Sequence, residues 1–171
     1  MTDLSLVPAF SQGAALAPRT LTPLTQSYLR FNLGPQAALL PTRQVQEAII
    51  MPVVRITPMP NMPSALLGLI NRRSQVLWVA DLALLLGLPV AFPNTQQYNL
   101  VLMQTGSVVL GLRVHQIDGI LSTPLNHIQP PPAHLPVSLV PFLRGCVLHE
   151  GDVLLVLDAD SLLRAPVLQV G

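Results

Sequence analysis

The feature that most constrains the fold is an internal repeat. Residues 68–81 align without a gap on residues 145–158, 77 positions later. Two proline clusters, between residues 52 and 63 and between 124 and 141, fall at matching places in the two copies. Upstream, the pairing continues at smaller offsets: Gln44-Val45 with Gln116-Ile117 at 72, and Tyr28 with Tyr98 at 70. Because loops lengthen more readily than strands after a duplication, the shifting offset indicates two copies of one unit.

Each copy is expected to form five short strands, because apolar and polar residues alternate between turn signals. The expected strands are 28–33, 37–40, 45–51, 68–71 and 76–80 in the first copy, and 98–103, 108–114, 117–123, 145–149 and 153–157 in the second. Proline lacks a ladder donor, so the proline clusters mark connections between strands. Short strands at this spacing predict an all-β barrel or sandwich.

The domain organisation follows from the repeat. A unit of about 70 residues barely builds a core of its own, so the two units are expected to pack together. We place the first unit at about 27–90 and the second at about 97–164. Residues 1–26 have no sustained period and are expected to form a flexible arm, and residues 165–171 an unstructured tail.

Three residues have simple structural explanations. Asp81 and Asp158 each end a strand and precede a short leucine-rich run, so each is expected to cap a helical turn. Asp160 then lies in the first turn, where its charge is favourable. The single cysteine, Cys146, lies in an apolar run and is expected to be a small buried residue.

Composition excludes several classes of function. Half of the residues are hydrophobic, but the longest apolar stretch, 76–92, contains Asp81 and Pro89, and a membrane span needs about 20 clean apolar residues. The N-terminus shows neither a secretory signal nor the glycine that myristoylation requires, so we expect a cytoplasmic protein. The nine arginines are nearly balanced by eight acidic residues and hardly cluster in the sequence, which argues against nucleic-acid binding.

No pattern of catalytic or ligand-binding residues stands out. His149-Glu150 lacks a second histidine at zinc spacing, and no glycine-rich phosphate loop follows a strand. Asp158 and Asp160 could form a metal pair, but capping already accounts for them. We therefore expect no catalytic residues, no metal and no cofactor, and a protein that is not an enzyme. An enzyme built on a small barrel stays as a disfavoured alternative.

Seven short patterns occur in an order that is familiar: residues 45–47, Pro63 followed by Gly68, residues 71–74, residues 79–82, and later Gly111, residues 128–130 and Gly145. Together they resemble the CheW-like domain family, the coupling proteins of bacterial chemotaxis, over residues 27–164. The resemblance implies two SH3-like five-stranded barrels related by duplication. It also implies a non-catalytic adaptor between chemoreceptor cytoplasmic tips and a CheA-type histidine kinase.

The sequence departs from the family pattern at four positions, which are Arg72, Ser74, Trp78 and His115. The changes put the identity of the partners in question more than the fold, and an array for pilus-driven or light-directed motility would be compatible with them. Other CheW-like domains are a further class of partner. The alternative function is a stand-alone kinase-binding module that does not engage a receptor.

The resemblance also suggests partner-binding residues, which are Val45, Glu47, Gly68, Arg73, Trp78 and Ile120. Val45 and Ile120 are candidates for an apolar groove that takes a receptor helix, and core packing is the alternative for both. Glu47 and Arg73 are expected to pair and to fix a hairpin for docking. Trp78 is expected to be either an interface residue or a core residue.

Overall fold

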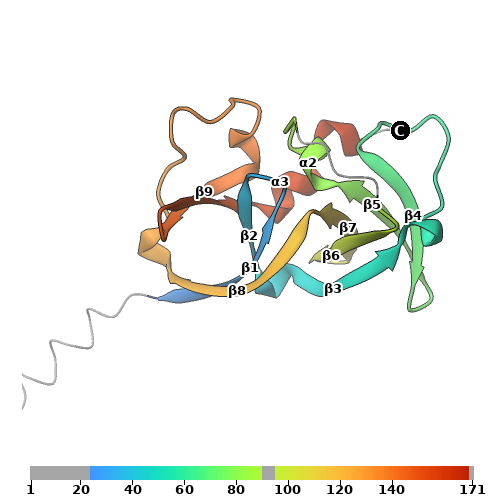
Figure 1. Cartoon of the computed structure of the whole chain (residues 1–171), viewed down its shortest axis with the longest axis horizontal. Coiled ribbons are helices and arrows are strands. Elements are labelled where there is room, and N and C mark those ends of the chain that lie inside the picture. The colour runs from blue at the N-terminus through green and yellow to red at the C-terminus, as the bar shows by residue number, and fades with distance from the viewer. Residues whose placement is uncertain (1–23, 90–94, 170–171) are drawn as a thin grey trace, which may run out of the picture.

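Ten strands form two five-stranded sheets in the computed structural model, which describes residues 24–89 and 95–169 (Figure 1). In sheet A the strands follow the order β8-β1-β2-β10-β9, and in sheet B the order β3-β6-β7-β5-β4. The bounds in sheet A are β8 (Gln116–Pro124), β1 (Thr25–Asn32), β2 (Ala37–Pro41), β10 (Asp152–Leu157) and β9 (Leu143–His149). Those in sheet B are β3 (Val45–Pro52), β6 (Gln97–Thr105), β7 (Val108–Val114), β5 (Gln75–Asp81) and β4 (Leu66–Arg72). All ten expected strands are present, and the all-β prediction is confirmed.

The two sheets are equivalent, but each takes strands from both copies of the repeat. Replacing every strand by its counterpart in the other copy turns the order of sheet A into the order of sheet B. Sheet A combines the first two strands of copy one with the last three of copy two, and sheet B does the reverse. The expectation that residues 27–90 form one barrel and 97–164 the other is therefore wrong. Alternation fixes which face a strand buries but not which strand it pairs with.

Strand register defines the repeat more closely than sequence identity does. Tyr28 pairs with Leu121 in sheet A, whereas the residue that pairs with Ile49 in sheet B is Leu100. Since Ile49 and Leu121 are counterparts at the offset of 72, Tyr28 corresponds to Leu100. The alignment of Tyr28 with Tyr98 is therefore wrong by two residues. The bulges agree with the offset of 72, because the skipped residues, Gln46 and Asp118, are also 72 apart.

Each copy ends in a capped helical turn, as expected. Asp81 precedes α2 (Leu82–Leu85) and accepts a hydrogen bond from the Leu84 backbone N–H at 3.2 Å. Asp158 precedes α3 (Ala159–Leu163) and accepts from Asp160 N–H, also at 3.2 Å. An N-cap of this kind contributes about 1 kcal/mol. Short 3-10 turns complete the structure at Thr42–Gln44, Val53–Arg55, Leu125–His127, Val140–Phe142 and Pro166–Leu168.

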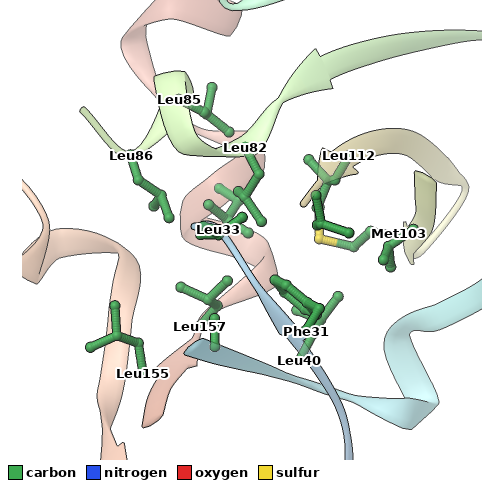
Figure 2. Close-up of a cluster of buried hydrophobic side chains, with 14 of the residues drawn as sticks. Phe31, Leu33, Leu40, Leu82, Leu85, Leu86, Met103, Leu112, Leu155 and Leu157 are labelled. Atoms are coloured by element: carbon green, nitrogen blue, oxygen red, sulfur yellow. The ribbon is translucent and has the colours of Figure 1, made fainter. Parts of the chain in front are cut away.

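One large hydrophobic core is shared by both sheets (Figure 2). Phe31 and Leu40 reach it from sheet A, and Met103 and Leu112 from sheet B, each fully buried. Two smaller clusters lie within sheet B, around Leu102, and within sheet A. Cys146 is buried, as expected, and burial raises the pKa of its thiol. Sheets A and B thus meet mainly through this packed core. A partner can reach only the outer margin of the region where they meet.

Both ends of the described chain differ from expectation. Thr25 and Gln26 already pair with Pro124 and Thr123, so the first strand begins inside the segment expected to be a flexible arm. The rest of that expected arm, residues 1–23, lies outside the described residues. The tail is partly ordered, because Leu168 lies in a 3-10 turn and packs against the shared core. Apolar residues in the tail therefore contribute to the fold.

Candidate functional site

The β4–β5 hairpin turns on Arg73 and Ser74, which both adopt positive φ, at 53° and 64°. Two-residue hairpin loops favour this geometry because it matches the twist of the flanking strands, but it suits glycine best at the second position. The β9–β10 hairpin makes the same turn with Glu150 and Gly151. The β4–β5 hairpin therefore has Ser74 at the position where the β9–β10 hairpin has the favoured glycine, Gly151.

Glu47 on β3 lies at the tip of this hairpin and pairs with both arginines. Arg72 donates through Nη2 to Oε1 and through Nε to Oε2, the second at 3.4 Å. Arg73 Nη2 also lies 3.4 Å from Oε1. Glu47 keeps 17% of its side chain exposed, Arg72 34% and Arg73 77%. The expected contact between Glu47 and Arg73 is present, but the principal partner of the carboxylate is Arg72, which the sequence pattern did not indicate.

The ion pair changes the titration of Glu47. The side-chain hydrogen bond from Arg72 holds the pKa of the Glu47 carboxyl below its ordinary value, and the charges of Arg72 and Arg73 act in the same direction. The same hydrogen bond raises the pKa of Arg72. Glu47 and Arg72 are therefore both charged at neutral pH, and Arg73 presents its guanidinium at the surface.

Gly68 is a packing residue within the described structure. It is buried with φ at +146°, and a Cβ there would collide with the backbone carbonyl of Thr57. Thr57 forms an isolated bridge with Leu69, which ties the segment after β3 to strand β4. Gly145 has the same role in sheet A, where a Cβ would lie 2.5 Å from Gln129 O. Partner binding by Gly68 stays a prediction, and any such effect would be indirect.

A shallow groove of about 520 Å³ lies between strands β3 and β8, at the outer margin of the two sheets. Its lining residues are Ala48, Ile49, Ile50, Asn99, Gln116 and Ile117. The side chains of Ile50 and Ile120 are 65% and 64% exposed, although both are large and apolar. Val45 packs against the shared core and, like Ile120, is not among the lining residues. The apolar lining of this groove therefore comes from neighbouring positions on the same two strands, and partner binding by Val45 and Ile120 stays a prediction.

Trp78 on β5 is half-buried and packs against the shared core, while also facing a second groove. This groove encloses about 230 Å³, and its lining residues are Met62, Leu66, Trp78, Val108, Val109, Leu110, Leu163 and Leu168. The two expected roles of Trp78, in the core and at an interface, are therefore compatible. An aromatic side chain that is anchored in the core and open on one side is typical of interface hot spots.

Other charged groups have structural roles. Arg113 Nη1 lies 3.4 Å from Oδ2 of Asp81, which also caps α2, and the Arg113 guanidinium lies 3.9 Å from the centre of the Tyr98 ring. The side chains of Arg113 and Asp81 are 11% and 3% exposed. Within residues 24–89 and 95–169, no group of three or more His, Cys, Asp or Glu side chains could hold a metal ion. No helix in those ranges is long and apolar enough to cross a membrane.

Comparison with known proteins gives consistent matches. The model of the CheW-like domain family matches residues 27–167. The chain is 32% identical over 145 residues to the chemotaxis protein CheW of Rhizobium meliloti (strain 1021), a match that covers 85% of this chain and 92% of the relative. It is 29% identical over 146 residues to the probable chemotaxis protein CheW of Rhizobium etli, with the same coverage. The crystal structure of the scaffolding protein TtCheW from Thermoanaerobacter tengcongensis aligns with a TM-score of 0.69 at 20% identity, over 79% of this chain and 90% of that one. This last likeness bears on the fold.

Proposed function

The chain belongs to the CheW-like domain family, and on that premise we propose that it couples the cytoplasmic tips of methyl-accepting chemoreceptors to a CheA-type histidine kinase. Proteins of this family are scaffolds or adaptors, not enzymes. In this role the chain acts in the cytoplasm and contributes two docking surfaces and no chemistry. Its relatives from Rhizobium are named as chemotaxis proteins, which supports a place in a chemotaxis array.

The observation that carries the proposal is the groove between β3 and β8. Exposed isoleucines beside a groove offer apolar surface for a partner to cover, and burying one such side chain is favourable by about 1.5–3 kcal/mol. A receptor tip is helical, and an amphipathic helix binds a groove through one apolar face. We assign the receptor contact to Ile49, Ile50 and Ile117, with Ile120 beside them and Val45 supporting β3 from the core.

The hairpin tip of β4 and β5 supports the same contact through charge. Glu47 and Arg72 tie this tip to β3, the strand that also lines the groove. Arg73 extends from this tip with most of its side chain in solvent. Charged groups at the rim of an interface mainly steer and orient the partner. We assign the kinase contact to the groove at Trp78.

Co-sedimentation tests the proposal. Membranes that contain a chemoreceptor are mixed with the kinase, with and without the full chain, and the pellet is analysed. We expect the kinase to pellet with receptor membranes when the chain is present and to stay in solution when it is absent. A chain that binds the kinase but never pellets with receptor membranes would instead be a stand-alone kinase-binding module. A matched control replaces Ile50 with Lys, which should abolish pelleting of the chain and leave kinase binding intact.

A further inference from the structure

The two halves of the protein differ in one loop. Between the isolated bridge and the next strand, sheet B has the eight residues 58–65 and sheet A the thirteen residues 130–142. The two loops end alike, because the Asp81 N–H donates to Ala65 O at 2.7 Å and the Asp158 N–H donates to Phe142 O at 2.9 Å. The five additional residues of the sheet A loop therefore lie before this shared ending.

The longer loop covers a site that the shorter loop leaves open. Counting back from the shared ending, Leu139 is the counterpart of Met62. Leu139 is 1% exposed in the shared core, and Leu135, which lies in the longer loop, also packs against that core. Met62 instead is half-buried and lines the groove at Trp78. The counterpart of Trp78 is Leu155, which is fully buried.

The rim of the site differs in the same way. In sheet A, Gln36 closes the site with its amide, which donates to Val153 O at 3.1 Å. At the offset of 72 its counterpart in sheet B is Val108, which is 50% exposed, and the counterpart of Val153 is Val76, which is 63% exposed. Sheet B thus has apolar side chains in solvent where sheet A has a polar cover. A site that one half fills with its own leucines is left unfilled in the other.

We propose that the groove at Trp78 is a socket for a leucine-sized aliphatic side chain on a loop of the kinase. This side chain takes the place that the longer loop of sheet A fills from within the chain. The inference rests on the proposed function, in which a CheA-type kinase is the partner. We infer an aliphatic side chain because leucines from the longer loop fill the equivalent site in sheet A. The rim valines, Val76 and Val108, then surround the inserted side chain and exclude water.

Trp78 is the single tryptophan of the chain, so it reports on the socket without ambiguity. The full chain is labelled with 5-fluorotryptophan and titrated with the unlabelled kinase, and the one ¹⁹F resonance is followed. Affinity is measured by calorimetry for the wild type and for Val108→Gln and Val76→Thr, two exposed rim changes that leave the core intact. Val137→Gln, at an 86% exposed position in the longer loop of sheet A, is the matched control.

The expected result is a shift of the ¹⁹F resonance on binding, a loss of affinity of about tenfold or more in a rim variant, and wild-type affinity in the control. Binding that leaves the resonance unmoved, or rim variants that both bind like the wild type, overturns the socket and leaves the proposed function standing. A kinase that does not bind the wild-type chain at all overturns both.

Discussion

Arg72 on β4 donates to both carboxylate oxygens of Glu47 on β3, with Nε 3.4 Å from Oε2. These two strands are at opposite ends of the order in sheet B, so the ion pair closes the curled sheet at one end. The bridge between Thr57 and Leu69 closes it further along β4. Arg73, one residue later, contacts the same carboxylate and remains mostly in solvent. The two adjacent arginines therefore differ in role: Arg72 stabilises the fold, whereas Arg73 is available at the surface.

We expect Arg73→Ala to weaken the coupling of kinase to receptor while leaving the fold intact. Because the side chain is largely exposed, its loss should shift the unfolding midpoint by about 2 °C or less. Co-sedimentation with receptor membranes and kinase measures the coupling. Arg72→Ala is the matched comparison, and it should lower the unfolding midpoint more than Arg73→Ala does. Unchanged assembly with Arg73→Ala would remove this residue from the docking surface.

The ion pair also predicts an acid-sensitive contribution to stability. The folded pKa of Glu47 lies below its ordinary value of 4.5, so the unfolded chain takes up a proton at this site first as the pH falls. The stabilisation is therefore complete above the ordinary pKa and is lost as the pH falls through the lowered folded value. Denaturant unfolding of the wild type and Glu47→Gln should differ at pH 7 and converge in acid. A difference that grows as the pH falls would contradict the assignment.

Gly68→Ala should be strongly destabilising. A Cβ at this position would collide with the Thr57 carbonyl, and backbone cannot move aside as a flexible side chain can. We expect a loss of about 3 kcal/mol or more in the free energy of unfolding, because overpacking and the strain of the positive φ add together. Gly106→Ala is the control, because its φ is +62° but no atom lies within 4 Å of the added Cβ. It should lose only about 1–2 kcal/mol from backbone strain. Equal losses in the two variants would show that steric contact at Gly68 is unimportant.

Ser74→Gly should stabilise the protein. Ser74 adopts φ of 64° at the turn position where the other hairpin has Gly151. Relief of the left-handed strain outweighs the greater entropy of glycine in the unfolded chain, for a net gain of about 0.5–1 kcal/mol. Thermal unfolding measures the gain, and the reciprocal change, Gly151→Ser, should destabilise by a similar amount. A stabilising Gly151→Ser would mean that the two turns are not equivalent.

The sequence was sufficient for the elements of this fold, but not for their pairing. The gap-free alignment of residues 68–81 on 145–158 correctly located the two hairpins and the caps at Asp81 and Asp158, since each depends on local chemistry. Exchange of strands between the copies depends on contacts far apart in the chain, which period-2 alternation does not encode. The match of Tyr28 with Tyr98 was misleading because strand register, which also depends on distant contacts, decides which residues are structurally equivalent.

The candidate site was predictable in part. The contact between Glu47 and Arg73 followed from the family resemblance, while the stronger contact with Arg72 occurs at a position where this chain departs from the family pattern. The resemblance suggests partner binding by Gly68, whereas its backbone geometry explains the glycine through packing. The grooves at Ile50 and Trp78 depend on which apolar side chains the finished fold leaves uncovered. Hydrophobicity alone does not distinguish such residues from core.

In the proposed function, this chain transmits receptor control to a kinase. The most direct measurement is the rate of kinase autophosphorylation in receptor membranes, with and without the full chain, before and after addition of the receptor's stimulus. We expect the rate to respond to the stimulus when the chain is present and to stay at the level of free kinase when it is absent. A rate that responds equally well without the chain, or that never responds when receptor, kinase and chain are combined, would contradict it.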